Sequence, residues 1–425
     1  MSQNHLRDEV QAAARAARVA AATLRRLTTD QKNEALLAVS ARLRDETGRI
    51  LKENAQDVSA AVENQTPPGI IDRLTLTEDR LAAICDALET VVELRDPVGE
   101  VVRGYRLPNG LRVEQVRVPM GVVGMIYEAR PNVTVDAAGL ALKSGNACLL
   151  RGSSSAAATN SVLISVMREA LDAVGVPADA IIAVPGTSHE SVQHLMAARG
   201  LVDVLIPRGG AGLINSVVTG SQVPVIETGI GNCHVYVDAS ADLDRAVDIV
   251  LNAKVQRPSV CNAAETLLVH RDIAAAFYER AAPALARAGV RLHADSDTTT
   301  LVQGSGIDCE PVTDEDWAAE YYSLDLAAGV VDDIAGAIAH ISNWSTGHTE
   351  AIVADSASVI TEFLAGVDSA AVAVNASTRF TDGGELGFGA EIGISTQKLH
   401  ARGPMALPEL TTTTFIITGN GHVRA

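Results

Sequence analysis

Hydrophobic and polar residues change their spacing twice along this chain of 425 residues. Up to about residue 95, apolar residues recur every three or four positions, which predicts helices over 5–26, 31–63 with a break, and 77–95. Thr29 or Asp30 is a suitable cap for the second helix. Apolar and polar residues then alternate on both sides of Asn109-Gly110, a pair that tolerates the positive φ of a tight turn. A β-hairpin over 101–118 is therefore predicted.

From residue 147 onward, short apolar runs alternate with helical segments. The runs are ACLLR, AIIAVPG, VDVLIP and VPVIE, and Thr187 with Glu190 has the spacing of a capping box for the helix after the second run. Apolar strands separated by helices predict a parallel sheet covered by helices. This is the layout of a dinucleotide-binding domain, although the layout alone fixes no ligand.

A second α/β region begins at NCHVYVD (232–238) and continues to SAAVAVNAST (369–378). Within it, residues 294–316 are polar and irregular, which predicts a loop. The tail LPELTTTTFIITGNG has the residue types of a strand, and we expect its exposed edge to pair with another subunit.

Charge and cysteine content exclude several classes of partner. The chain has 34 Lys and Arg against 52 Asp and Glu, a net charge of −18, which argues against binding to nucleic acid or to an anionic membrane surface. No apolar window is long enough to span a membrane, and the N-terminal segment is charged like an amphipathic helix rather than a signal peptide. Five widely spaced cysteines without a C-x-x-C motif predict no disulfide framework and no metal site. We expect a cytoplasmic protein.

Cys261 stands out among the cysteines because it follows a Pro-Ser loop at the junction of a long helix and an apolar strand. A thiolate at such a chain reversal can attack a carbonyl and form a thioester. A packed core thiol is the alternative, and the local sequence leaves it open. Cys148 and Cys233 lie within apolar strands and are assigned to the core, and Cys309 lies in a polar loop without a basic neighbour.

Three other stretches contain candidate polar groups. Asn132 follows Pro131 at the end of a predicted strand, where its amide is either an oxyanion donor or a turn residue. Glu227 ends the run VPVIE, where its carboxylate either meets a ligand or caps the next loop. The segment PRGGAG (207–212) follows a strand and opens a helix, so its N–H groups are suited to a phosphate.

Several long motifs, in this order, resemble segments of the aldehyde dehydrogenase superfamily. They are YEARPNVTVDAAGLALKSGNACLLRGSSSA, VIETGIGNCHVYVD, VQRPSVCNAAET and NASTRFTDGGELGFGAEIGIST. They are most similar to the branch of the superfamily that reduces γ-glutamyl phosphate. The resemblance covers nearly the whole chain. It implies an α/β, aldehyde-dehydrogenase-like fold with two parallel-sheet domains and a small β oligomerisation element. The expected parts are an NADP(H)-binding domain over 1–228, a catalytic domain over 229–400, and a return segment and oligomerisation tail over 401–425. The 101–118 hairpin would belong to the oligomerisation element.

The same resemblance assigns catalytic roles. Cys261 matches the nucleophile, and Asn132 matches the amide that stabilises the oxyanion together with the Cys261 N–H. Glu227 matches the base that hydrolyses the thioester in oxidising relatives. A reductase should not hydrolyse its thioester, so Glu227 is expected either to deprotonate Cys261 or to organise the cofactor site.

Cofactor and substrate residues follow from the same motifs. Many NAD-using relatives have a Glu where this chain has Ser154. The resemblance therefore favours NADPH, because the carboxylate that would repel a 2′-phosphate is absent and Arg151 is expected to attract that phosphate. Glu320 resembles the residue that binds the nicotinamide ribose. The full cofactor set is Arg151, Ser153, Ser154, Pro207, Arg208, Gly209, Gly210 and Glu320. For the substrate carboxylate and phosphate we expect Arg130, Ser377, Thr378 and Arg379.

The implied reaction is the NADPH-dependent reduction of L-glutamyl 5-phosphate to L-glutamate 5-semialdehyde and phosphate through a Cys261 thioester, in proline biosynthesis. A homo-oligomer is expected, and transient contact with glutamate 5-kinase is open. Three alternatives remain: a hydrolytic aldehyde dehydrogenase, a nucleotide-independent thiol acyltransferase, and a non-catalytic scaffold. The joint presence of Cys261, Asn132, Glu227 and Glu320 argues against the scaffold.

Overall fold

The computed structural model describes residues 3–424, which form two compact units. Unit 1 holds the chain up to Glu227 together with Gly387–Gly393 and the segment from Met405 onward. Unit 2 holds Thr228–Leu386 and Ile394–Pro404. The functional labels given to the domains in the sequence analysis stay predictions.

Unit 1 begins with helices. Four of them match the predicted helical segments: α1 (Gln3–Leu24), α2 (Thr29–Asp45), α3 (Thr47–Glu63) and α5 (Glu78–Glu93). The short helix α4 (Pro68–Leu74) was not predicted. Helix α2 is capped by Thr28 and not by Thr29 or Asp30, because Thr28 and Gln31 form a reciprocal capping box. The cap lies one residue earlier than predicted, because Gln31, at the third helical position, forms the reciprocal hydrogen bonds with Thr28.

A four-stranded parallel sheet of order β5-β4-β3-β6 follows. Its strands are β3 (Val122–Tyr127), β4 (Ala147–Arg151), β5 (Ile181–Ala183) and β6 (Val204–Arg208). Its helices are α6 (Pro131–Lys143), α7 (Ala157–Ala173), α8 (His189–Met196) and α9 (Ala211–Gly220). The strand predicted at VPVIE is wrong as a regular element, because it makes only one bridge, from Val225 to Leu205. Its hydrogen bonds join Pro224 and Ile226 to the same residue of β6, so the segment runs beside the sheet for one step only.

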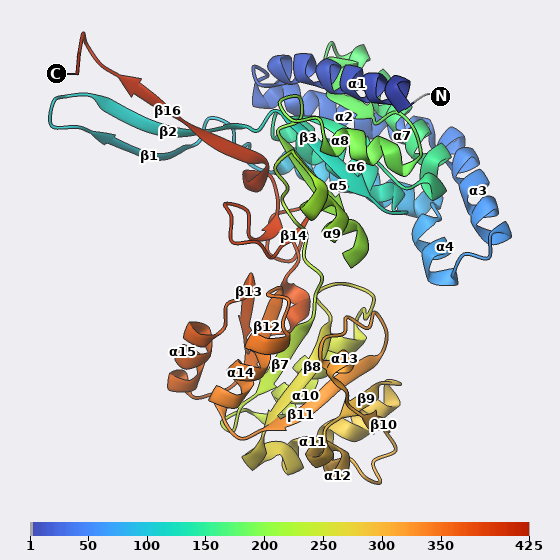
Figure 1. The fold of residues 1–425 in the computed structure, drawn as a ribbon, viewed down its shortest axis with the longest axis vertical. Helices are drawn as coiled ribbons and strands as arrows, with labels where there is room; N and C mark the ends of the chain where they lie inside the picture. Colours follow the sequence, from blue (N-terminus) through green and yellow to red (C-terminus); the bar gives the residue numbers. More distant parts are fainter. Residues whose placement is uncertain (1–2, 425) are drawn as a thin grey trace. The chain divides into compact units, whose positions relative to one another are not determined.

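The predicted hairpin is present as β1 (Val101–Arg106) and β2 (Arg112–Pro119), which pair antiparallel. The tail forms β16 (Thr411–Thr418), which pairs antiparallel along the other edge of β2. Figure 1 shows this three-stranded ribbon, with the red β16 beside the cyan β2. Both outer strands carry exposed apolar side chains: Val101, Val102, Tyr105, Phe415, Ile416 and Ile417.

Unit 2 is built on a seven-stranded parallel sheet of order β10-β9-β11-β8-β7-β12-β13. The strands are β7 (Cys233–Val237), β8 (Ala264–His270), β9 (Arg291–Ala294), β10 (Asp308–Pro311), β11 (Asp325–Val331), β12 (Thr349–Val353) and β13 (Ala371–Val374). Alternate residues face opposite layers, as strand geometry requires. Leu267 and Val269 pack with Phe277 of α11 (Arg271–Arg287), whereas Leu268 packs with Phe363 of α15 (Ala357–Gly366). The other helices that cover the sheet are α10 (Leu243–Val255) and α14 (Ile334–Trp344).

The loop predicted over 294–316 is wrong as a structureless segment. It contains α12 (Ser296–Leu301), the edge strand β10, and α13 (Asp314–Trp317). Asp295 caps α12, and a capping box between Thr313 and Asp316 starts α13. These short helices lack the apolar spacing used to predict helices, and polar capping residues define their ends instead. Two short paired strands, β14 (Gly393–Ser395) and β15 (Gly403–Met405), complete the fold.

Candidate active site

Cys261 lies in the loop that joins α10 to β8 in unit 2, and its side chain is partly exposed. Cys148 and Cys233 are fully buried, as predicted, and burial raises the pKa of the Cys148 thiol to about 12. Such thiols stay protonated and inert at neutral pH. The core-thiol alternative therefore describes Cys148 and Cys233 and does not describe Cys261.

The Cys261 backbone is held from the side of β7. The Cys233 thiol donates to the Cys261 carbonyl oxygen, with 3.2 Å between Sγ and O. A Cβ on Gly231 would lie 1.4 Å from the same oxygen, so only glycine fits there. Two residues near the start of one strand thus fix the main chain of the candidate nucleophile.

The next residue, Asn262, is held by the segment that contains the predicted substrate residues. Its side-chain amide donates to the carbonyl oxygens of Arg379 (3.3 Å) and Thr381 (2.9 Å). The Thr378 hydroxyl donates to the Asn262 carbonyl oxygen at 2.7 Å. Thr378 is fully buried, so its hydroxyl anchors the Cys261 loop instead of facing a ligand, which corrects the expectation for this side chain.

Arg379, the residue after Thr378, also contacts the segment that leads to the nucleophile. Its Nε donates to the side-chain oxygen of Gln256, five residues before Cys261, at 2.8 Å. Burial lowers the pKa of Arg379, Arg257 lowers it further, and the Cys261 thiol acts in the opposite direction. A guanidinium within electrostatic reach of a thiol favours the thiolate. Ser377 is buried, and its hydroxyl accepts from the Arg379 N–H at 3.3 Å.

Glu320 also lies beside the Cys261 loop. Its carboxylate accepts the Gly231 N–H at 2.9 Å and the Tyr322 hydroxyl at 2.5 Å, and burial raises its pKa. Gly231 in turn packs against the Cys261 carbonyl, so Glu320 contacts the main chain of the nucleophile through a single intervening residue. The residue matched to the nicotinamide ribose and the residue matched to the nucleophile therefore belong to one local network.

The predicted cofactor residues of unit 1 gather at one edge of its sheet. Strands β3, β4 and β6 are parallel and end at Tyr127, Arg151 and Arg208, so the segments that follow them leave from the same carboxyl edge. This is the edge at which open α/β sheets bind ligands. Pro207 and Arg208 end β6, and Gly209 and Gly210 lead directly into α9.

Glu128, which was not among the predicted residues, lies at the same glycine turn. Its carboxylate accepts the Gly210 N–H at 3.0 Å, and a Cβ on Gly209 would lie 2.6 Å from the Glu128 carboxyl carbon. The glycine turn is thus a cradle of suitable chemistry for an anion, and a carboxylate of the chain itself occupies it. The position of Glu128 directly after the apolar run that ends at Tyr127 was the available signal.

Arg151 differs from expectation. Its side chain is buried and donates to the Ser191 hydroxyl at 2.8 Å, to the Thr187 carbonyl oxygen at 2.8 Å, and to the Gly152 and Ser188 carbonyl oxygens. These hydrogen bonds join the end of β4 to the turn before α8. The Arg151 guanidinium is therefore used in contacts within the protein and does not face a 2′-phosphate. Ser154 is exposed, and Ser153 caps the short 3₁₀ turn 154–156.

Asn132 lies in the first turn of α6 and not at a strand end, because Pro131 opens a helix. Arg130 is the residue before this helix. The exposed Asn132 amide donates to the Asp136 carboxylate at 3.1 Å, one helical turn away. Burial raises the pKa of Asp136 to about 6, against opposing effects of Asn132 and Arg208.

The predicted residues divide between the two units. Asn132, Glu227, Arg130 and the cofactor residues other than Glu320 lie in unit 1, whereas Cys261, Glu320 and residues 377–379 lie in unit 2. Glu227 is partly buried and is the last residue before the chain enters unit 2.

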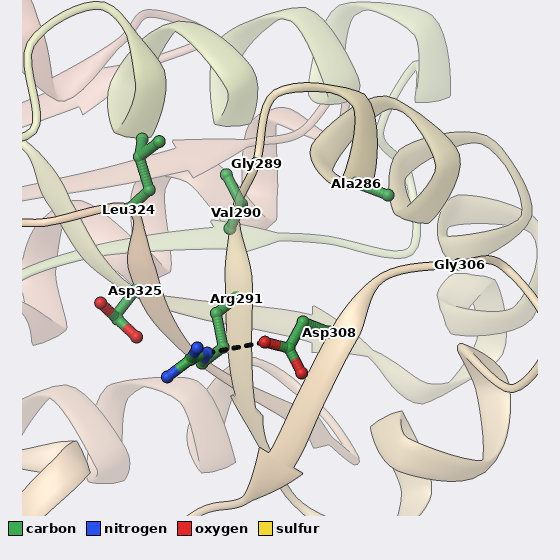
Figure 2. A pocket seen from close by; sticks show the side chains of 8 residues that line it. All are labelled: Ala286, Gly289, Val290, Arg291, Gly306, Asp308, Leu324 and Asp325. Carbon is green, nitrogen blue, oxygen red and sulfur yellow. Dashed lines mark hydrogen bonds and ion pairs between the residues drawn. The ribbon is translucent and has the colours of Figure 1, made fainter.

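A separate pocket lies at the amino ends of β9, β10 and β11 (Figure 2). Arg291 donates to the Asp308 carboxylate there at 2.8 Å, and Asp325 lies on the same wall. None of the predicted site residues lines this pocket. Within residues 3–424, no group of His, Cys, Asp and Glu side chains is arranged to hold a metal ion, and no helix is long and apolar enough to cross a membrane.

Comparison with known proteins supports the resemblance seen in the motifs. The model of the aldehyde dehydrogenase family matches residues 2–308. The chain is 62% identical over 416 residues to the γ-glutamyl phosphate reductase of Thermobifida fusca, covering 98% of this chain and 99% of that one. It is 57% identical over 417 residues to the protein of the same name from Kineococcus radiotolerans, covering 98% and 96% of the two chains.

Solved structures agree. A γ-glutamyl phosphate reductase from Thermotoga maritima superimposes with a TM-score of 0.95 at 46% identity, covering 98% of this chain and all of the other. An acetylating aldehyde dehydrogenase from Geobacillus thermoglucosidasius shares the fold, with a TM-score of 0.72 at 19% identity over 100% and 99% of the chains. The predicted α/β, aldehyde-dehydrogenase-like fold class is confirmed. The chain belongs to the aldehyde dehydrogenase family, in the branch of the γ-glutamyl phosphate reductases.

Proposed function

We propose that this protein reduces L-glutamyl 5-phosphate with NADPH to L-glutamate 5-semialdehyde and phosphate, a step of proline biosynthesis, in the cytoplasm. The observation that carries the proposal is the 62% identity with a γ-glutamyl phosphate reductase across 98% of the chain. The partly exposed Cys261, held by its main chain in a prepared loop, supports it.

In the proposed reaction, the Cys261 thiolate attacks the carbonyl carbon of the acyl phosphate and forms a C–S bond. The carbonyl oxygen becomes an oxyanion, which the Cys261 N–H and the Asn132 amide stabilise. The C–O bond to the phosphate then breaks, and phosphate leaves with the bonding electrons. The product is a thioester on Cys261, which is activated for reduction in a way that a free carboxylate is not.

When bound, NADPH supplies the hydride that reduces the thioester carbonyl. The adduct then collapses, the C–S bond breaks, and Cys261 leaves as a thiolate while the semialdehyde forms. The Gly209-Gly210 turn fits a pyrophosphate, because the Gly210 N–H already binds a carboxylate and a Cβ on Gly209 would fill the cradle. Glu320 would hold the nicotinamide ribose, and Ser154 leaves room for a 2′-phosphate.

Substrate binding is assigned to Arg379 and Arg130. Ser377 would support Arg379, because the Ser377 hydroxyl accepts the backbone N–H of Arg379. Glu227 would deprotonate Cys261 or organise the cofactor site. Contact with glutamate 5-kinase remains a hypothesis.

We also propose that the protein is a homo-oligomer assembled through the β1-β2-β16 ribbon. Both outer strands have unpaired edges within residues 3–424 and carry exposed apolar residues, including Tyr105 and Ile417. Exposed apolar strands of this kind are sites of association. Light scattering of Ile417→Lys is expected to show a smaller particle than the wild type, and an unchanged mass would contradict this assembly.

The test of the reaction is NADP⁺ reduction by glutamate 5-semialdehyde, the reverse direction, with inorganic phosphate as the acyl acceptor. Turnover that requires phosphate supports the proposal. Turnover without phosphate would indicate thioester hydrolysis and a hydrolytic aldehyde dehydrogenase instead. Acyl transfer to thiols without any nucleotide would favour the acyltransferase.

A further inference from the structure

A buried ion pair closes the base of the loop that carries Cys261. Lys254 Nζ lies 2.6 Å from Glu265 Oε2, and both side chains have no exposed surface. Lys254 is in the last turn of α10, and Glu265 is the second residue of β8. The pair therefore joins the end of the helix that enters the loop to the start of the strand that leaves it.

The ion pair lies within electrostatic reach of the residues that hold Cys261. Burial lowers the pKa of Lys254 and raises that of Glu265, while the opposite charge of each partner opposes both shifts. Glu320 raises the pKa of Glu265 further, and the Cys233 thiol acts on Lys254. Glu320 binds the Gly231 N–H and Cys233 binds the Cys261 carbonyl, so the pair and the nucleophile share neighbours.

Stability alone does not explain a pair of this kind. Two charges removed from water lose a hydration energy that their attraction only partly restores, and apolar replacements of similar volume are often as stable. Leu267 and Val269, which follow Glu265 at alternate positions of β8, are fully buried apolar residues, so an apolar pair would suit this face of the strand. An ion pair differs from an apolar contact in being directional, since it fixes one atom against another.

We propose that Lys254 and Glu265 are positioning residues that set the spacing between the two ends of the Cys261 loop, and thereby place the Cys261 N–H and thiol for acyl transfer. The inference rests on the proposed role of Cys261 as the nucleophile. Neither side chain takes part in bond making. Their contribution is to the geometry of the loop, whose misplacement by about 1 Å is enough to slow acyl transfer strongly.

The test separates stability from catalysis with three variants. Glu265→Gln leaves a buried lysine without its counter-charge and is expected to lower both the melting temperature and kcat. The double variant Lys254→Met/Glu265→Leu is expected to recover the melting temperature and to keep kcat at least about tenfold below the wild type, with KM for NADP⁺ unchanged. Glu265→Asp keeps the charge but withdraws the carboxylate, and we expect a folded protein with lowered kcat.

The exposed pair of Asp244 on α10 with Arg280 provides the matched control, and Asp244→Asn is expected to change neither quantity. Recovery of both melting temperature and kcat in the double variant would overturn the proposal, as would wild-type kcat in Glu265→Asp. The alkylation rate of Cys261 by iodoacetamide, followed by mass spectrometry, gives a second readout that needs no substrate. A slower alkylation rate in Glu265→Asp supports the positioning role even if wild-type turnover proves independent of phosphate. Failure of the proposed reaction would be seen in the wild-type enzyme, as turnover that does not require phosphate.

Discussion

The α-carbon of Gly231 lies against the carbonyl oxygen of Cys261 so closely that a side chain at Gly231 has no room. Its Cβ would lie 1.4 Å from that oxygen, 2.4 Å from the carbonyl carbon and 2.9 Å from the α-carbon. Gly231→Ala must therefore displace the Cys261 main chain and weaken its bond from Cys233. We expect kcat to fall on the order of a hundredfold, measured in the phosphate-dependent assay.

Gly336→Ala in the same unit is the control for this substitution. A Cβ there would meet its nearest atoms at 3.6 Å, which is ordinary contact, so kcat should stay at the wild-type value. Equal activities of the two variants would show that the main chain of Cys261 tolerates displacement.

The Asp136 carboxyl gives a predicted pH dependence. Burial raises its pKa from 3.8 to about 6, so between these values the folded chain binds the proton more tightly than the unfolded chain. The free energy of unfolding should consequently fall as pH rises from about 4 to about 6, and Asp136→Asn should remove this slope in chemical denaturation.

Activity should respond to the same titration in the opposite direction. Above pH 6 the carboxylate accepts the Asn132 amide and orients it, and below pH 6 that bond weakens. We expect an acidic limb in kcat/KM near pH 6 in the wild type and none in Asp136→Asn, whose amide oxygen still accepts. A limb that persists in the variant would assign it to another group.

Glu128 should weaken cofactor binding, because its carboxylate takes the Gly210 N–H that a phosphate needs. Glu128→Gln keeps the hydrogen bond and removes the charge, so KM for NADP⁺ should fall severalfold with kcat unchanged. Glu63→Gln, an exposed substitution in the same unit, should leave KM unaltered. A higher KM in Glu128→Gln would instead mean that the carboxylate helps to shape the site.

Cofactor choice should depend on Ser154. A carboxylate at this exposed position would repel a 2′-phosphate, so Ser154→Glu should raise KM for NADP⁺ by about tenfold or more and improve the use of NAD⁺. Ser155→Glu, its exposed neighbour, should have a smaller effect. Similar shifts in both variants would indicate a general effect of charge rather than a specific contact.

Local sequence was sufficient to predict the long N-terminal helices α1, α2, α3 and α5, the Asn109-Gly110 hairpin and the buried Cys148 and Cys233, because each depends on spacing or on a turn residue. Thr187 and Glu190 show the limit of such signals. They have capping-box spacing, yet Ser188 precedes α8, and the Thr187 carbonyl accepts from Arg151. The capping-box spacing therefore placed the start of this helix one residue too early.

Contacts between distant segments could not be predicted. The register of β16 on β2 joins residues almost 300 positions apart, as in the bond from Gln115 to Thr413. The commitment of Arg151 to the α8 turn and the Lys254–Glu265 pair likewise depend on how elements pack. The motifs identified Cys261, whereas the thiol, glycine and threonine that hold its loop became visible only in the fold.

The thioester on Cys261 is the central claim, and one measurement tests it most directly. NADP⁺ reduction by glutamate 5-semialdehyde is followed with and without inorganic phosphate, for the wild type, Cys261→Ser and the control Cys309→Ser. We predict phosphate-dependent turnover in the wild type and in Cys309→Ser, and none in Cys261→Ser. Phosphate-dependent turnover that survives in Cys261→Ser would contradict the account.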